Sequence, residues 1–214
     1  MKIISHRGLW HKSSEKNTLI SFKNSIDKNF GFEIDIRSFN GDLVVSHDPL
    51  NDKKKFIDFK DILTYYKKVN SDVLVAINVK EDGLNILIKQ VLKEFKIKNY
   101  FVFDMSIPDM IAYSKSNICF YTRQSEYEKY PALYNEASGV WLDEFHKHWI
   151  DKKTVQFHLS NNKNLCIVSP DLHKRDFINE WEEYKKILFS SNQSDQLMIC
   201  TDYPEKAEKF FELK

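Results

Sequence analysis

Short apolar runs alternate along the chain with longer segments in which apolar residues recur at helical spacing. Segments of the second kind include "NTLISFKNSIDKN" (17–29), "DGLNILIKQVLKEF" (82–95) and "FINEWEEYKKILFSS" (177–191). The apolar runs span residues 2–6, 32–37, 73–79, 100–104, 118–121, 139–142, 165–168 and 197–200. Eight repeats of strand followed by helix predict an α/β protein, a (β/α)8 TIM barrel, with a doubly wound open sheet as the main alternative.

The sequence offers no obvious point at which to divide the chain into domains. It contains no Pro/Gly/Ser-rich linker, no internal repeat and no low-complexity tract. A single domain over residues 1–214 is therefore expected. Only five glycines occur, and none belongs to a GxGxxG or GxxxxGK pattern, so a nucleotide-cradling loop is not expected.

One further apolar run, "LVVSH" at 43–47, interrupts the alternation. It follows "FEIDIRSF" (32–39) after an Asn-Gly pair, Asn40-Gly41, which is a strong hairpin signal. The sequence thus predicts a β-hairpin after the second strand, and the hairpin ends at His47.

Two acids share one face of the predicted strand 32–37. Glu33 and Asp35 lie two residues apart, and their charges repel unless a cation or a proton lies between them; a solvated strand face is the alternative. A strict two-residue hairpin loop would set His47 opposite Ile34, on the other face. If His47 shares a site with the two acids, a longer loop or a bulge is expected.

Polar residues stand at or just after the ends of most of the predicted strands. They are His6, Glu33, Asp35, Lys80, Asp104, Asp143 and Asp202. In a (β/α)8 barrel the carboxyl ends of the strands form the active-site face. The polar residues at these positions therefore indicate that the predicted barrel carries an active site.

Composition narrows the class of partner. Lys and Arg number 32 against 31 Asp and Glu, so the chain lacks the basic field that nucleic-acid binding requires. No apolar run is long enough for a spanning helix, and the start of the chain does not resemble a signal peptide. Three cysteines, odd in number and set in apolar runs, suit a reducing compartment. We expect a soluble cytoplasmic protein that binds no nucleic acid.

Several short motifs occur together in a recognisable order: "HRG" (6–8), "EKNTLISF" (15–22), "EIDI" (33–36), "VVSHDPL" (44–50), "INVK" (77–80) and "CTDYPE" (200–205). In this order the sequence resembles the glycerophosphodiester phosphodiesterases. The match is dense over residues 3–50, whereas residues 84–196 resemble the family only in pattern. The resemblance implies a barrel enzyme of lipid metabolism that cleaves a phosphodiester with the help of a divalent cation.

The chemistry of the residues agrees with this resemblance. His6 and His47 could act as the acid and base, since imidazole titrates near neutral pH. Glu33 and Asp35 are hard oxygen ligands suited to Mg²⁺ or Ca²⁺, with Mn²⁺ also possible. Arg7 and Lys80 could hold the phosphate oxygens. A lyase that forms a cyclic phosphate, and an impaired barrel that only binds a phosphorylated ligand, are the alternatives.

Two features depart from the family pattern. Asn78 occupies the position at which the family usually has a glutamate that completes the metal site, so weaker metal binding is expected. Only 30 residues separate His47 from Asn78, where the family usually inserts a small helical subdomain. The insertion is expected to be reduced to about one helix or absent. A more open site would admit a sugar-phosphate or polymeric glycerol-phosphate substrate; the oligomeric state is left open.

Polar and aromatic residues late in the chain are ambiguous. Trp141 could stack on the substrate or belong to the core, Asp143 could face the site or point away from it, and Arg123 could bind an anion or form a surface ion pair. Five further histidines remain. His146 and His148 have metal-ligand spacing but are interpreted as a solvated loop, His173 could bind an anion or lie at the surface, and His11 and His158 are placed at the surface.

Overall fold

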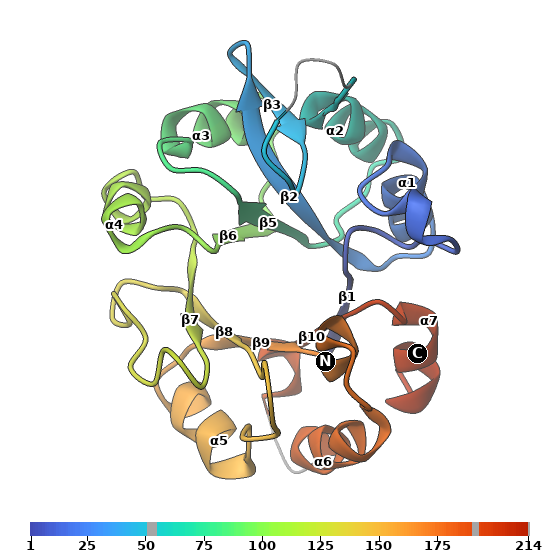
Figure 1. Cartoon of the computed structure of the whole chain (residues 1–214), viewed down its shortest axis with the longest axis vertical. Helices are drawn as coiled ribbons and strands as arrows, with labels where there is room; N and C mark the ends of the chain where they lie inside the picture. The colour runs from blue at the N-terminus through green and yellow to red at the C-terminus, as the bar shows by residue number, and fades with distance from the viewer. Residues whose placement is uncertain (51–54, 190–192, 214) are drawn as a thin grey trace. The chain divides into compact units, whose positions relative to one another are not determined.

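The computed structural model describes residues 1–50, 55–189 and 193–213, which fall into two compact units (Figure 1). We call Ser5–Phe120 the N-terminal unit, and Met1–Ile4 together with Tyr121–Lys214 the C-terminal unit. Strand β1 (Lys2–Ser5) runs across the boundary between them.

In the N-terminal unit the strand order is β4-β3-β2-β5-β6. The strands are β2 (Gly31–Phe39), β3 (Asp42–Val45), β4 (Ile57–Asp58), β5 (Val75–Val79) and β6 (Tyr100–Phe103). The β2, β5 and β6 strands are parallel, whereas β3 is antiparallel to β2 and to β4. The helices are the 3₁₀ turn η1 (Ser13–Glu15), α1 (Leu19–Asp27), α2 (Phe59–Lys68), α3 (Asn85–Glu94) and α4 (Ile107–Lys115).

Local sequence signals explain where these helices begin. Thr18 caps α1, Asp58 caps α2 and Ser106 caps α4, each accepting a hydrogen bond from a backbone N–H of the first turn. The apolar faces of the helices then cover the sheet, and the rings of Phe22 on α1 and Phe32 on β2 lie 5.3 Å apart in the core. The N-cap residues and the apolar faces therefore indicate the same segments as helices.

The predicted hairpin is confirmed. Its described residues contain neither the longer loop nor the bulge that was expected if His47 shares a site with the acids. Phe39 pairs with Asp42, so the loop is the two residues Asn40 and Gly41, with φ of 51° and 89°. The Ser46 amide still donates to a β2 carbonyl, and the chain then bends at His47. Because the strand has ended there, the alternation of faces no longer dictates the direction of that residue.

Between His47 and Asn78 the described residues contain the single helix α2, as the short spacing predicts; residues 51–54 lie outside the described part. The predicted strand 118–121 lies too early in the sequence. The corresponding strand β7 is Tyr121–Gln124, because the apolar residues before Tyr121 form only an isolated bridge to β6 and the polar "TRQ" continues the strand.

The C-terminal unit is built from parallel strands in the order β10-β9-β8-β7. Its elements are β7 (Tyr121–Gln124), β8 (Gly139–Leu142), α5 (Lys152–Ser160), β9 (Asn164–Val168), η2 (Pro170–His173), α6 (Ile178–Phe189), η3 (Ser194–Gln196), β10 (Leu197–Thr201) and α7 (Pro204–Phe210). Among the described helices of the chain, none has the length and apolarity that crossing a bilayer requires.

The turn after β1 requires glycine. Gly8 has φ of +81°, and a Cβ there would lie 2.7 Å from the Ser21 backbone carbon and 2.8 Å from its Cβ. Gly41 has a similar φ of +89°, but a Cβ there meets nothing within 4 Å. A side chain at position 8 would therefore cause both backbone strain and steric overlap, whereas one at position 41 would cause backbone strain alone.

We predict that Gly8→Ala lowers the free energy of unfolding by roughly 3 kcal/mol or more, because strain and overlap add. Gly41→Ala, the matched control, should cost about 1 kcal/mol from strain alone. Urea unfolding of both variants measures the difference. Equal losses would show that the chain relaxes around residue 8 and that the close approach to α1 is unimportant.

Candidate active site

The "HRG" turn places a histidine and an arginine at the amino end of α1. Arg7 and Gly8 both have positive φ, which reverses the chain after β1. The turn is tied to the start of α1, since Asn17 and Ser21 both donate to the Arg7 carbonyl, at 3.0 and 3.1 Å. The direction of Arg7 is thus set by backbone contacts as well as by its side chain.

Two buried carboxylates project from β2 toward this turn. Glu33 and Asp35 are almost completely buried, at 1 % and 0 % exposed. The Arg7 backbone N–H donates to Glu33 Oε2 at 3.0 Å, and His6 Nε2 lies 3.9 Å from the same oxygen. The predicted pairing of the acids on one face is therefore found, and the face is not solvated.

Three side chains contact Asp35: two carry a positive charge and one donates a hydrogen bond. Its Oδ2 accepts from Asn17 Nδ2 at 2.7 Å and lies 3.1 Å from Arg7 Nε, while its Oδ1 lies 3.2 Å from Lys80 Nζ. Burial raises the pKa of Asp35, but Lys80, Arg7 and Asn17 more than offset this and leave it below the ordinary value. The Asp35 carboxylate is therefore ionised.

The pKa of Glu33 is shifted in the opposite direction. Burial, with the neighbouring Asp35 charge, raises its pKa to about 7, against the smaller opposing effects of His6, Lys80 and Arg7. Two carboxylates on one buried face thus have different affinities for a proton, because the cations contact one and only approach the other.

The N-terminal unit also holds an amide oxygen in register with these acids. Asn78 on β5 pairs with Asp35 on β2 in parallel register and is 8 % exposed. Within the described residues, Asn78 Oδ1, Glu33 Oε1 and Asp35 Oδ1 are buried without a hydrogen-bond donor, although Asp35 Oδ1 has the Lys80 ion pair. Buried oxygens without donors are the chemistry that a hard divalent cation requires, so this residue set fits such an ion.

Lys80 connects this cluster to the next strand. Its Nζ lies 3.8 Å from Asp104 Oδ2, and Asp104, directly after β6, has a positive φ of 74°. A non-glycine residue in this region costs about 1 kcal/mol or more, and such strain is often found at functional positions.

His47 lies at the end of the hairpin. Its side chain is 46 % exposed, its Nδ1 lies 2.8 Å from Asp48 Oδ1, and its carbonyl accepts from Arg37 at 3.1 Å. An electrostatic effect of His47 is the smallest of those that lower the pKa of Asp35, which places it in the electrostatic surroundings of that acid. Sequence reasoning assigned no role to Asn17, although the "EKNT" motif contains it.

The predicted residues of the C-terminal unit form a separate group. Trp141 on β8 is 5 % exposed, the exposure of a core side chain, and is in register with Arg123 on β7. Arg123 forms ion pairs with Glu128, at 3.1 Å, and Asp143, at 3.8 Å. For Arg123, Trp141 and Asp143, contact with substrate stays a prediction.

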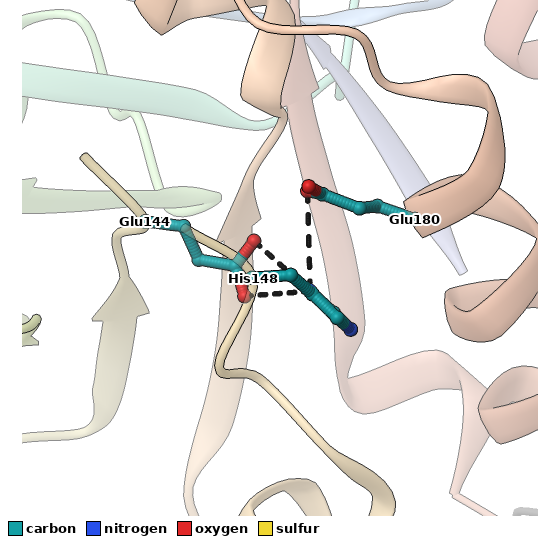
Figure 2. A group of neighbouring side chains, drawn as sticks. All are labelled: Glu144, His148 and Glu180. Carbon is teal, nitrogen blue, oxygen red and sulfur yellow. Dashed lines mark hydrogen bonds and ion pairs between the residues drawn. The ribbon is translucent and has the colours of Figure 1, made fainter. Parts of the chain in front are cut away.

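A second acidic group, Glu144, His148 and Glu180, has ligand atoms within 4.8 Å of one another (Figure 2). Figure 2 shows His148 between the two carboxylates. His148 lies in a loop, as predicted, but the loop is not simply solvated there, because its Nδ1 lies 2.9 Å from Glu144 and its Nε2 3.0 Å from Glu183. Glu144 Oε1 accepts from two backbone N–H groups, and Arg175 contacts both Glu144 and Glu180. These charges are largely compensated within the protein.

His158, placed at the surface by sequence reasoning, is buried between α5 and β7. Its Nδ1 accepts from Tyr134 Oη at 2.8 Å, and its Nε2 donates to Gln124 Oε1 at 2.7 Å. Burial lowers the pKa of His158 to about 4, so the imidazole is neutral. Its two hydrogen bonds connect α5 to β7 and to Tyr134 within the C-terminal unit.

The parallel strands with covering helices, and the polar groups that follow them, define an α/β protein with a cluster of acids, cations and a histidine at strand ends. No protein-family model matches the sequence, and no curated protein matches it. Solved structures do match over almost the whole chain.

A proposed glycerophosphodiester phosphodiesterase from Galdieria sulphuraria has a TM-score of 0.78 and 15 % identity, covering 99 % of this chain and 97 % of that one. A glycerophosphodiester phosphodiesterase from Parabacteroides distasonis has a TM-score of 0.68 and 18 % identity, covering 99 % of this chain and 96 % of that one. A phosphodiesterase from Oleispira antarctica was solved in complex with the product sn-glycerol-3-phosphate. It has a TM-score of 0.67 and 15 % identity, covering 99 % of this chain and 97 % of that one. The fold class is therefore the (β/α)8 barrel of these enzymes, and the resemblance seen in the motifs is confirmed in the fold.

The raised pKa of Glu33 has a consequence for stability. Between pH 4.5 and about 7 the unfolded chain has lost a proton that folded Glu33 retains, so this residue makes stability fall as pH rises through that window. Glu33→Gln removes the charge and keeps an acceptor for the Arg7 amide. In buffer with a chelator we predict that the variant is about 3 kcal/mol more stable than the wild type at pH 8 and nearly unchanged at pH 4.5, measured by urea unfolding. An equal loss of stability at both pH values would contradict this.

Proposed function

We propose that this chain is a phosphodiesterase that cleaves a glycerophosphodiester, or a related sugar or glycerol phosphodiester, with a divalent cation. The observation that supports it best is the pair of buried acids on β2, which share one face with buried oxygens that lack donors and are flanked by Arg7, Lys80 and His6. The family-like motifs and the barrel fold shared with glycerophosphodiester phosphodiesterases support the same conclusion.

Glu33, Asp35 and Asn78 would hold the cation, with Mg²⁺ or Ca²⁺ preferred and Mn²⁺ also suitable for oxygen ligands. When bound, such an ion neutralises charge that develops on the phosphoryl oxygens. Asn78 contributes an oxygen but no charge. The protein therefore offers the ion two carboxylates, and we infer a weaker site than one with three.

Arg7 and Lys80 would bind the non-bridging oxygens of the substrate. In the structure both contact Asp35, Arg7 through Nε and Lys80 through Nζ. The guanidinium retains its two terminal nitrogens for bidentate contact with phosphate, and Lys80 is positioned by Asp35 and Asp104 together.

His6 and His47 would transfer the protons. One accepts the proton of the attacking hydroxyl as the new P–O bond forms, and the other donates a proton to the leaving alcohol as the old P–O bond breaks. Water as the attacking group gives hydrolysis. A neighbouring hydroxyl of the substrate gives a cyclic phosphate, and a barrel that binds a phosphorylated ligand without turnover is the further alternative.

We also propose that residues 1–214 act as a single barrel domain in the cytoplasm, on a small-molecule or polymeric phosphodiester. The short connection between His47 and Asn78 supports an open substrate site, because α2 is its one described helix. We assign no nucleic-acid role, since the numbers of acidic and basic residues are nearly equal.

We predict that His6→Ala and His47→Ala each lower kcat by roughly 10²–10⁴-fold, because each removes a proton-transfer group. The assay uses glycerophosphodiesters, lysophospholipids and a chromogenic diester, with Mg²⁺, Mn²⁺ or Ca²⁺ and with chelator. His11→Ala, at an exposed histidine of the same unit, is the control and should retain full activity. Phosphate binding by a folded wild type without turnover on any diester would favour the binding-only alternative.

Asn78→Glu is predicted to tighten Mg²⁺ binding at least roughly tenfold, since it adds a third negative charge to the oxygen set. Asn78→Ala should weaken binding. Titration calorimetry of the chelator-treated protein measures both without reference to activity. If neither variant changes the affinity, Asn78 does not belong to the cation site.

A further inference from the structure

Two acids that the proposed mechanism does not use, Asp82 and Asp109, meet where the loop after β5 approaches the start of α4. Asp82 Oδ2 accepts from the Ser106 hydroxyl at 2.6 Å, and Asp109 Oδ1 accepts from the Gly83 backbone N–H at 3.0 Å. The Ser106 hydroxyl also accepts from the Asp109 backbone N–H, at 3.3 Å. The acids therefore form one cluster within the N-terminal unit, beside the contact between α3 and α4 (Figure 1).

Two polar atoms of this cluster are buried without a partner. Asp109 is 7 % exposed, and its Oδ2 atom has no hydrogen-bond donor within the described residues. Tyr113 is 0 % exposed, and its hydroxyl has no partner among these residues either. Because residues four apart lie on the same face of a helix, the two groups share one side of α4. A buried carboxylate oxygen without a partner is unfavourable, so a ligand is expected beside it.

The charges of both acids act on the Tyr113 hydroxyl. Burial raises the pKa of Tyr113, and the charges of Asp109 and Asp82 raise it further, so the hydroxyl is neutral. Burial also raises the pKa of Asp109, the Gly83 N–H lowers it by a smaller amount, and the Asp82 charge raises it again. Asp109 lies in the first turn of α4, where the helix dipole favours a negative charge. The oxygens of these three side chains therefore share one negative environment.

The lysines nearest in sequence do not neutralise this cluster. Lys80 Nζ lies 3.2 Å from Asp35 and 3.8 Å from Asp104, and Lys89 Nζ donates to the backbone carbonyl of the residue after α4. Within the part of the chain that the structure describes, neither acid of the cluster forms an ion pair. Two neighbouring carboxylates that lack an opposite charge favour the binding of a cation.

The chemistry of the cluster suits Ca²⁺ better than water or Mg²⁺. A water molecule could bridge the Asp109 carboxylate and the Tyr113 hydroxyl, but it would leave two negative charges uncompensated. Ca²⁺ accepts irregular sets of carboxylate, neutral and water oxygens, whereas Mg²⁺ requires a near-ideal octahedron and keeps several waters. Asp82 and Ser106 are exposed while Asp109 and Tyr113 are buried, so an ion there would keep water ligands on its solvent side.

We propose that Asp82 and Asp109 bind a Ca²⁺ ion between the loop after β5 and the start of α4, with the Tyr113 hydroxyl as a neutral oxygen of the same site. The site shares no residue with the proposed cation site on β2. An ion bound there would hold together the segments that follow β5 and β6, so its role is structural. The inference does not depend on the proposed function.

Calorimetric titration with Ca²⁺ tests this site in the chelator-treated Glu33→Gln variant, because that substitution weakens the β2 site. We expect Glu33→Gln still to bind Ca²⁺. Adding Asp109→Asn should weaken this binding at least roughly tenfold, since it removes a charged ligand and keeps an acceptor for the Gly83 N–H. Adding Asp82→Asn should weaken it in the same way. Because Asp82 is exposed, this second variant preserves the test if Asp109→Asn does not fold.

Asp61→Asn is the matched control, because Asp61 lies in the first turn of α2 as Asp109 lies in the first turn of α4, but is exposed. In the Glu33→Gln background it should leave the Ca²⁺ affinity unchanged. Ca²⁺ should also raise the urea midpoint of Glu33→Gln, and this rise should be lost when Asp109→Asn is added. Unchanged affinity in both the Asp109→Asn and Asp82→Asn variants would overturn the site. Absence of Ca²⁺ binding by folded Glu33→Gln would also overturn it and would favour a buried water between Asp109 and Tyr113.

Discussion

The burial of two like charges on one face of β2 is the constraint on which the N-terminal unit depends. Removing Glu33 and Asp35 from water is unfavourable unless opposite charges or donors compensate them. The compensating groups come from separate segments: Arg7 from the turn after β1, Asn17 from the approach to α1, and Lys80 from the end of β5. The tight HRG turn and the close contact of Gly8 with Ser21 serve to place Arg7 against the acids.

The negative charges of the two acids are not compensated equally, and this difference decides which oxygens a cation could bind. Asp35 is surrounded by cations and donors, whereas Glu33 accepts one backbone N–H and keeps a buried oxygen without a donor. The Glu144 group differs, since its carboxylate accepts from backbone N–H groups and Tyr184 and lies beside Arg175. An incoming cation would gain ligands without donors at the first group and would compete with an arginine at the second. This contrast supports our proposal that Glu33, Asp35 and Asn78 form the cation site.

Much of this could be predicted from sequence, because the signals are local. Alternation of apolar runs and helical segments gave the fold class, and the spacing of Glu33 and Asp35 gave their shared face. The Asn-Gly pair predicted the hairpin, and its two-residue loop is found, while a role for His47 beside the acids stays a prediction. His158 was misplaced, because its partner Tyr134 is 24 residues away and no periodicity in the sequence connects them.

The central claim is that a divalent cation binds at the acids of β2. The most direct measurement is a crystal structure of the protein with Mn²⁺ and sn-glycerol-3-phosphate, in which anomalous scattering locates the ion. The account predicts an ion about 2.2 Å from oxygens of Glu33, Asp35 and Asn78, with the phosphate contacting Arg7 or Lys80. An ion bound instead by Glu144, His148 and Glu180, with none at β2, would contradict it.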